Sequence, residues 1–216
     1  MNLAAAAPTP LHRLERLSLL HGVDLWVKRD DLFPIPGGGN KGRKLLRIVQ
    51  DAESEGCDAL VTAGGTQSNQ ARVAAIFAAS LGWPCELILH GDPEELRTPS
   101  GNLLLMILAG ASITVVPPES VGPALDRALE KLTAQGRRPI LIPGRGYCQA
   151  GSLAFADAAR ELLEQCPAGW HPDYIVLASG TGTTQAGLLA GRFAANFEKY
   201  RAAVPAVVAA AGPRAE

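Results

Sequence analysis

Short apolar runs alternate with longer stretches of helical spacing along most of this chain. The apolar runs predict buried strands at residues 59–63, 85–90, 112–116, 139–142, 174–178 and 206–211. The helical spacing between them predicts helices at residues 69–81, 101–109, 121–134, 151–164 and 184–197. Strands that alternate with helices of this length are typical of βαβ units, so we expect parallel sheets with helices on both faces. The pattern predicts an α/β fold.

The first fifty or so residues follow a different pattern. Leucine spacing over residues 14–20 predicts a short helix, and alternation over residues 24–29 predicts a half-buried strand. Three consecutive glycines, Gly37–Gly39, then precede another stretch of helical character. Asn40 is placed to cap that helix, which puts Lys41 in its first turn.

Composition and charge exclude several classes of protein. The 216 residues are enough for one large domain or two small ones, and the balance of 47% hydrophobic and 19% charged residues is that of a globular protein. The net charge of −1 disfavours nucleic acid or an anionic membrane as the main partner. No apolar segment approaches the length of a bilayer span, and the first ten residues lack the basic region of a signal peptide.

The cysteines and histidines are scattered. Cys57, Cys85, Cys148 and Cys166 form no CxxC pair, and the four histidines form no HExxH motif. We therefore expect no metal site and no disulfide scaffold, and we predict a cytoplasmic protein.

Lys41 is a candidate reactive amine. Glycines before it leave the backbone free to pass close to a ligand, and the helix dipole with the charges of Arg43 and Lys44 would lower the pKa of its amine. More free amine would then be available to attack a carbonyl. A solvated basic helix start is the alternative interpretation.

Two further loops follow predicted strands. Residues 179–184 place glycines and hydroxyls before a helix, an arrangement that suits a phosphate, although the loop is neither a Walker loop nor a complete GxGxxG motif. Residues 64–70 concentrate neutral hydrogen-bonding groups at a helix start, which suits a carboxylate. The alternatives are a tight turn for the first loop and plain capping by Ser68 or Asn69 for the second. A lysine, a phosphate loop and a carboxylate loop together fit pyridoxal 5′-phosphate with an amino-acid substrate.

Several segments resemble one known family, and they keep its order and spacing over nearly the whole chain. They are residues 8–11 (PTPL), 27–31 (VKRDD), 38–45 (GGNKGRKL), 56–61 (GCDALV), 67–72 (QSNQAR), 139–144 (PILIPG) and 180–187 (GTGTTQAG). The chain is similar to the 1-aminocyclopropane-1-carboxylate deaminase/D-cysteine desulfhydrase family of fold-type II pyridoxal-phosphate enzymes.

This resemblance implies roles for the three loops. Lys41 would form the Schiff base with the cofactor and carry the proton at the substrate α-carbon, with Ser68 as the second catalytic residue. Asn69 would bond the ring 3-hydroxyl, and the substrate carboxylate would be bound by Ser68, Asn69 and Gln70. Lys44 would lie close to the cofactor phosphate. The residues that hold the phosphate would be those of one loop and the helix start after it: Gly180, Thr181, Gly182, Thr183 and Thr184.

The resemblance also implies two parallel-sheet domains. Residues 51–161 would form the small domain, which carries the substrate-carboxylate loop, and residues 1–50 and 162–216 would form the large domain. The family's chain continues well past residue 216, so the large domain would be incomplete, as in a shortened product or fragment or a chain completed by a partner. A homodimer is implied as well.

The expected function is a lyase or deaminase that acts on a small amino acid and releases ammonia and a 2-oxo acid. The choice between opening a cyclopropane and eliminating a thiol stays open. An inactive, truncated remnant that binds pyridoxal phosphate is the alternative. A nucleotide-binding Rossmann domain is disfavoured by the incomplete glycine motif.

Overall fold

The computed structural model describes residues 8–34 and 38–195 of the chain. Its largest element is a four-stranded parallel sheet with the strand order β5-β4-β3-β6. The strands are β3 (Ala59–Gly65), β4 (Cys85–His90), β5 (Ser112–Val116) and β6 (Pro139–Ile142). This sheet confirms the α/β prediction and four of the strands expected from apolar runs.

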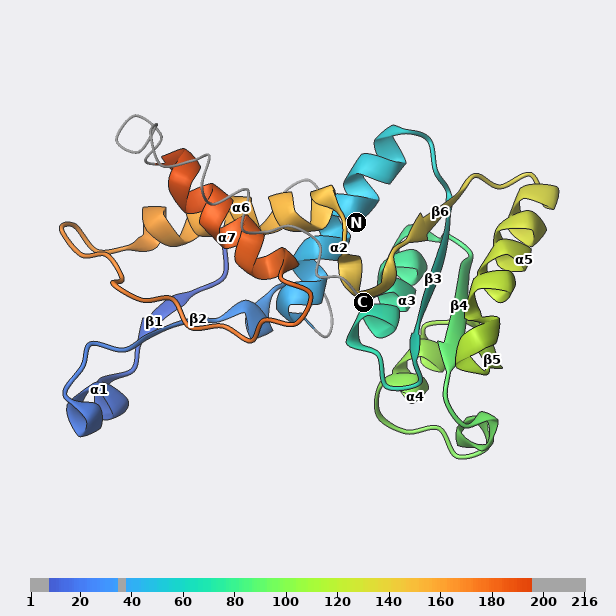
Figure 1. Cartoon of the computed structure of the whole chain (residues 1–216), viewed down its shortest axis with the longest axis horizontal. Coiled ribbons are helices and arrows are strands. Elements are labelled where there is room, and N and C mark those ends of the chain that lie inside the picture. Colours follow the sequence, from blue (N-terminus) through green and yellow to red (C-terminus); the bar gives the residue numbers. More distant parts are fainter. Residues whose placement is uncertain (1–7, 35–37, 196–216) are drawn as a thin grey trace.

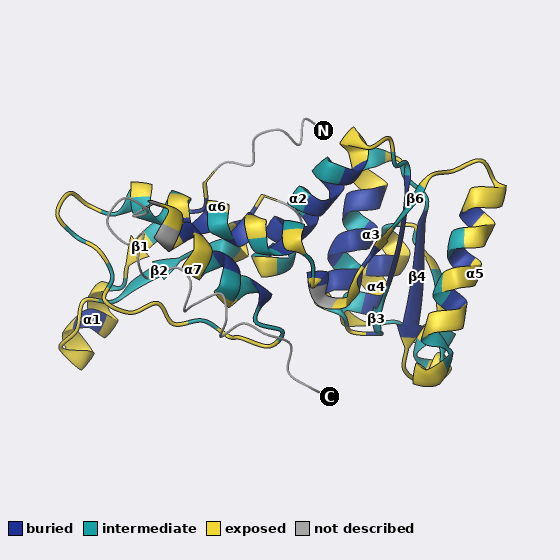
Figure 2. Ribbon diagram, turned by 45° about the horizontal axis from the view of Figure 1, so that its top comes forward, coloured by how far each residue is buried: buried dark blue, intermediate teal, exposed yellow. Residues whose placement is uncertain are grey.

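Helices cover both faces of this sheet (Figure 1). On one face lie α2 (Gly39–Ser54), α3 (Asn69–Leu81) and α4 (Gly101–Leu108). On the other lies α5 (Val121–Ala134), which packs Ala124, Ala128 and Leu132 against the sheet. The central strands β3 and β4 are buried over most of their length, as parallel strands between helix layers should be, whereas the outer strands β5 and β6 are only partly covered (Figure 2).

The rest of the chain forms a second part of the molecule beside α2. Strands β1 (Leu11–Arg13) and β2 (Trp26–Lys28) pair antiparallel around the short helix α1 (Glu15–His21). Helices α6 (Gln149–Gln165) and α7 (Thr183–Ala195) pack on each other, and α6 also packs on α2. Single 3-10 turns are η1 (Asp30–Leu32), η2 (Pro93–Leu96), η3 (Pro118–Ser120) and η4 (Gly144–Gly146).

Two glycines on α7 explain how closely α6 and α7 approach. A Cβ on Gly187 would lie 2.2 Å from the backbone oxygen of Ser152, and a Cβ on Gly191 would lie 2.3 Å from that of Ala156. Neither distance is possible for a side chain, so glycine is required at both positions. The contact makes α6 and α7 a tightly packed pair.

Two sequence expectations are corrected by the structure. Residues 174–178 form no strand; Val176 is 95% exposed, and no strand among the described residues pairs with it. Asn40 does not cap α2, because the helix begins at Gly39 and its N-cap is Gly38. The strand expected at 206–211 and the end of the last helix at 196–197 lie outside the described residues. The domain boundaries at 51 and 161 stay predictions.

Within the described residues, no helix combines the length and the apolar character that a membrane span requires.

Candidate active site

A cleft of about 90 Å³ lies between the start of α2 and the loop that leads into α7. Asn40, Lys41 and Lys44 line one wall, and the backbone and side chains of residues 178–182, with Thr184, line the other. The structure therefore brings the predicted reactive lysine and most of the predicted phosphate loop to one place. Thr183, also predicted for this loop, is buried beside it at the first position of α7.

The start of α2 is fixed by two close approaches to the preceding segment. Gly38 has a φ of 33°, and a Cβ on it would lie 2.7 Å from the backbone oxygen of Asp31. A Cβ on Gly42 would lie 2.8 Å from Cδ1 of Phe33. Glycine at both positions lets the first turn of α2 lie directly on the segment before it, which sets the position of Lys41.

Lys44 is almost completely buried beside this cleft, with 1% of its surface exposed. Burial is the main cause that lowers the pKa of its amine to about 8, and the charge of Lys41 lowers it further. The thiol of Cys148 acts weakly in the opposite direction. The ammonium lies 5.8 Å from the centre of the Phe155 ring. Lys44 is thus a cation held in an apolar setting beside an open cleft, where an anion would favour its charged form.

Arg43, by contrast, points away from the cleft. Its guanidinium donates to Asp30 and Glu161, with Nη2 at 2.9 Å and 2.8 Å from Oδ1 and Oε1 respectively. Lys28 forms an ion pair with the same Glu161. Burial opposes the charge of Glu161, but hydrogen bonds from Arg43 and Lys28 outweigh it and lower the pKa of this carboxyl to about 2.

The opposite wall offers groups that suit a phosphate. Gly182 has a φ of 77°, and its carbonyl accepts from the N–H of Ala186 at 2.8 Å, so the loop turns directly into α7. The hydroxyls of Thr181 and Thr183 lie 3.0 Å apart. Helix N–H groups, hydroxyls and the buried ammonium of Lys44 form a set of donors that fits a phosphate dianion.

The loop after β3 lies outside this cleft. Ser68 is the N-cap of α3, and its hydroxyl accepts from the N–H of Ala71 at 3.2 Å. Gln70 is 2% exposed, and its amide nitrogen donates to the carbonyl of Pro143 at 2.7 Å and to Oγ1 of Thr62 at 3.2 Å. The side chain of Gln70 is thus committed to the interior, and any contact with a substrate would come from its backbone.

Asn69 is exposed at the same helix start. Its side-chain oxygen accepts from Nδ2 of Asn102 at 3.0 Å. The loop after β6 connects this region with the cleft: Pro143 accepts from Gln70, and a Cβ on Gly146 would lie 3.3 Å from Cδ of Lys44. The substrate roles of Ser68, Asn69 and Gln70 stay predictions.

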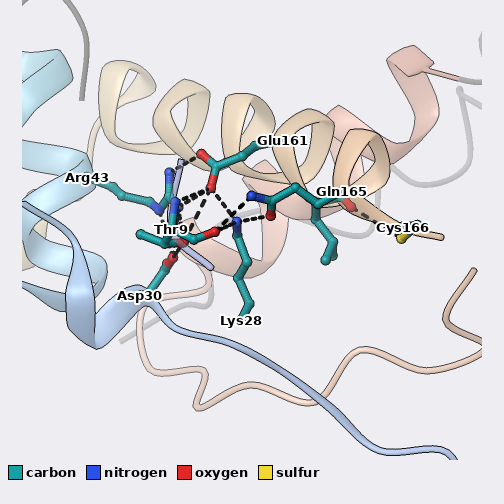
Figure 3. A network of polar contacts seen from close by, with 8 residues as sticks. Thr9, Lys28, Asp30, Arg43, Glu161, Gln165 and Cys166 are labelled. Atoms are coloured by element: carbon teal, nitrogen blue, oxygen red, sulfur yellow. Dashed lines mark hydrogen bonds and ion pairs between the residues drawn. The ribbon is translucent and has the colours of Figure 1, made fainter. Parts of the chain in front are cut away.

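Sequence reasoning missed the polar cluster around Arg43. The cluster joins five parts of the chain: β2, η1, α2, α6 and the residues that precede β1. Its members are Thr9, Lys28, Asp30, Arg43, Glu161 and Gln165 (Figure 3). Arg43 and Glu161 are 118 residues apart. No local pattern connects residues so far apart, and the only sequence signal was the charge of residues 28–31 ahead of the glycines.

A parallel α/β sheet and a cleft with a lysine from the first turn of a helix opposite a loop rich in glycine and threonine are the features expected of a pyridoxal-phosphate enzyme. Comparison with known proteins confirms that class. The sequence model described as "Pyridoxal-phosphate dependent enzyme" matches residues 3–213, and the chain belongs to this family.

Individual relatives agree with the narrower resemblance. The chain is 40% identical over 189 residues to a D-cysteine desulfhydrase of Salmonella typhi, and over 190 residues to one of Klebsiella pneumoniae. The alignments cover 86% of this chain and 58% of those relatives, so the chain spans under two thirds of their length.

Solved structures give the same picture. A crystal structure described as an ACC deaminase homologue superposes with a TM-score of 0.78 at 36% identity, over 88% of this chain and 57% of that one. An O-ureido-L-serine synthase superposes with a TM-score of 0.68 at 23% identity, over 92% of this chain and 61% of that one, a likeness of fold. The resemblance inferred from the motifs is confirmed.

Proposed function

We propose that this chain binds pyridoxal 5′-phosphate through Lys41 and acts as a lyase or deaminase on a small amino acid, releasing ammonia and a 2-oxo acid. The observation that carries the proposal is the cleft that places Lys41 and Lys44 opposite the loop of residues 178–184. An aldehyde and a phosphate on one small ligand would meet an amine and a phosphate site in that cleft.

Each wall has its own task. Lys41 would bond the aldehyde carbon and later move the proton at the substrate α-carbon. The N–H groups and hydroxyls at the start of α7 would hold the phosphate, with the charge of Lys44 beside it. When bound, the cofactor supplies an electron sink for the negative charge that develops at the α-carbon.

The loop after β3 is the proposed site for the rest of the ligand. The N–H groups of Asn69 and Gln70, the first two positions of α3, have no partner within the helix, so they can donate to a substrate carboxylate. Ser68 and Asn69 would add their side chains, and Asn69 would also bond the ring hydroxyl. Gln70 would contribute its N–H, because its side chain is bonded to Pro143 and Thr62.

The relatives suggest two substrates. With D-cysteine, the C–S bond breaks and sulfide leaves, and water then releases ammonia and the 2-oxo acid. With 1-aminocyclopropane-1-carboxylate, the ring opens, and water then releases ammonia and a 2-oxo acid with one more carbon, without sulfide. Both substrates have an amino group and a carboxylate on one carbon, which is what the proposed site recognises.

Reductive trapping tests the proposal. The purified chain mixed with pyridoxal 5′-phosphate should develop a visible absorption band that borohydride bleaches, and peptide mass spectrometry should then place the cofactor on Lys41. Lys41→Ala should lack the band, whereas Lys131→Ala, on the far side of the sheet, should keep it. Ammonia and sulfide assays with both amino acids then measure turnover. A cofactor found on another lysine would refute the proposal.

A second candidate is cofactor binding without turnover. The observation that favours it is that the chain spans 58% of the length of the relatives it matches. An absorption band at Lys41 with neither ammonia nor sulfide released would support this second function. Intact mass of the chain from its native source would show whether the assayed chain corresponds to the natural one.

Two finer expectations belong to the same proposal. We expect a homodimer, which sedimentation of the purified chain would test. We also expect a cytoplasmic location, in keeping with the free thiols of all four cysteines, and cell fractionation would test it.

A further inference from the structure

A buried ion cluster connects the two helices on which the cleft depends. Arg43 of α2 is 7% exposed, and it donates to both carboxylate oxygens of Glu161 of α6, with Nη1 2.9 Å from Oε2 and Nη2 2.8 Å from Oε1 (Figure 3). This is a two-point contact of a rigid guanidinium with a carboxylate, so it fixes orientation as well as distance.

Three further segments contribute groups to the cluster around Glu161 and Arg43. Lys28 of β2 forms an ion pair with it, the N–H of Thr9 donates to it at 2.9 Å, and Asp30 of η1 holds the other side of Arg43 at 2.9 Å. Rotation of Glu161 would break several of these bonds at once.

Helix α6 supports the other wall of the cleft, because α7, which follows the loop of that wall, packs against α6. Gly187 and Gly191 let α7 lie directly on α6, and the phosphate loop runs into the start of α7 at Thr183. Lys41 and Arg43 both lie within the first two turns of α2, which begins at Gly39. One path from Lys41 to the phosphate loop therefore runs through α2, the Arg43–Glu161 contact, α6 and α7, and Arg43–Glu161 is the most buried ion pair between α2 and α6 in the described structure.

We infer that Arg43 and Glu161 are positioning residues that set the spacing between Lys41 and the phosphate loop. The inference rests on the proposed function. A ligand that is held at both ends gains affinity only when the two sites lie at the right distance. The ion pair keeps them there without touching the ligand.

The chain offers a matched control one helical turn away. Arg47 of α2 and Asp157 of α6 also join the two helices, with Nη1 and Oδ2 3.4 Å apart. These side chains are 38% and 49% exposed, and such pairs contribute little. Glu161→Gln and Asp157→Asn therefore remove the same charge from the same helix face, and only the first removes the buried contact.

Three ligands separate positioning from simple stability. Pyridoxal 5′-phosphate needs both walls, pyridoxal needs only Lys41, and 4′-deoxypyridoxine 5′-phosphate, which has no aldehyde, needs only the phosphate loop. Dissociation constants are measured by absorbance or fluorescence titration, and thermal unfolding is followed in parallel. Glu161→Gln should weaken pyridoxal 5′-phosphate by roughly tenfold and change each of the other two by about twofold or less.

The outcomes are distinct. Asp157→Asn should leave all three dissociation constants unchanged. Glu161→Asp should give an intermediate loss of affinity for pyridoxal 5′-phosphate alone. This conservative variant replaces Glu161→Gln in the test if the glutamine variant fails to fold. Equal loss for all three ligands, or none for pyridoxal 5′-phosphate, would show that the ion pair only stabilises the fold. Absence of binding by the unaltered chain would instead refute the proposed function.

Discussion

The buried amine of Lys44 should make the stability of the protein depend on pH in the alkaline range. Its pKa is about 8 in the folded chain, whereas 10.5 is the ordinary value that we assign to the unfolded chain. Between these values the unfolded chain binds the additional proton, so the free energy of unfolding should rise as pH rises. A difference of about 2.5 pKa units corresponds to about 3 kcal/mol.

The perturbation is Lys44→Met, which keeps the length of the side chain and removes the charge. Urea unfolding is measured for both proteins at pH values from 7 to 11. Near pH 7 the variant should be more stable by up to about 3 kcal/mol, and the difference should shrink through the range from about 8 to 10.5. Taking the difference removes the titration of every group that the two proteins share.

Two further measurements test the cause. Lys41→Met removes the neighbouring charge, so the pKa of Lys44 should rise and the alkaline gain should shrink without disappearing, since burial is the larger cause. Inorganic phosphate at saturating concentration should also reduce the gain, because an anion in the cleft favours the ammonium form. If the unfolding curves of the original protein and Lys44→Met differ by a constant amount at all pH values, the reasoning is wrong.

Three other predictions concern the rest of the fold. The folded carboxyl of Glu161 has a lowered pKa, so its contribution of about 3 kcal/mol is present above about pH 4.5 and lost as pH falls toward 2; acid unfolding of Glu161→Gln should lack this loss. Ser68→Ala removes the acceptor for the N–H of Ala71 and should lower the free energy of unfolding by about 1 kcal/mol in a urea titration. Gly187→Ala places a methyl group against the backbone of Ser152 and should cost about 1–3 kcal/mol by the same titration, whereas an alanine at exposed Gly122, where a Cβ meets nothing, should not.

The sheet and its helices could be predicted because their signals are local. The residues of α5 carry helical spacing over 121–134, and the structure has the helix at those bounds. The runs at 112–116 and 139–142 are mainly apolar, with Ser112 and Thr114 as the exceptions, and both are strands with those bounds. The central strands β3 and β4 are the most buried, and strands covered on two faces need apolar residues at most positions, so the sequence shows them directly.

Other features depend on partners that are distant in the sequence. Residues 174–178 are as apolar as the true strands, but a strand exists only where another strand pairs with it, and the described residues offer none. The position of the cleft followed from the glycine-rich loops, whereas the ion pair of Arg43 with Glu161 joins residues 118 apart and left no local trace. Asn40 was assigned as a cap from its residue type, although the left-handed glycines before it allow the helix to start earlier.

Helix geometry explains why three neighbouring cations of α2, Lys41, Arg43 and Lys44, have different surroundings. Lys41 and Lys44 are three residues apart and so share one face of the helix, and both line the cleft. Arg43 and Arg47 are four apart and share another face, and both meet carboxylates of α6. Had Arg43 shared the face of the lysines, three cations would repel one another at one small cleft. Its ion pair with Glu161 instead joins α2 to α6, which leaves the two amines as the basic side chains of α2 that line the cleft.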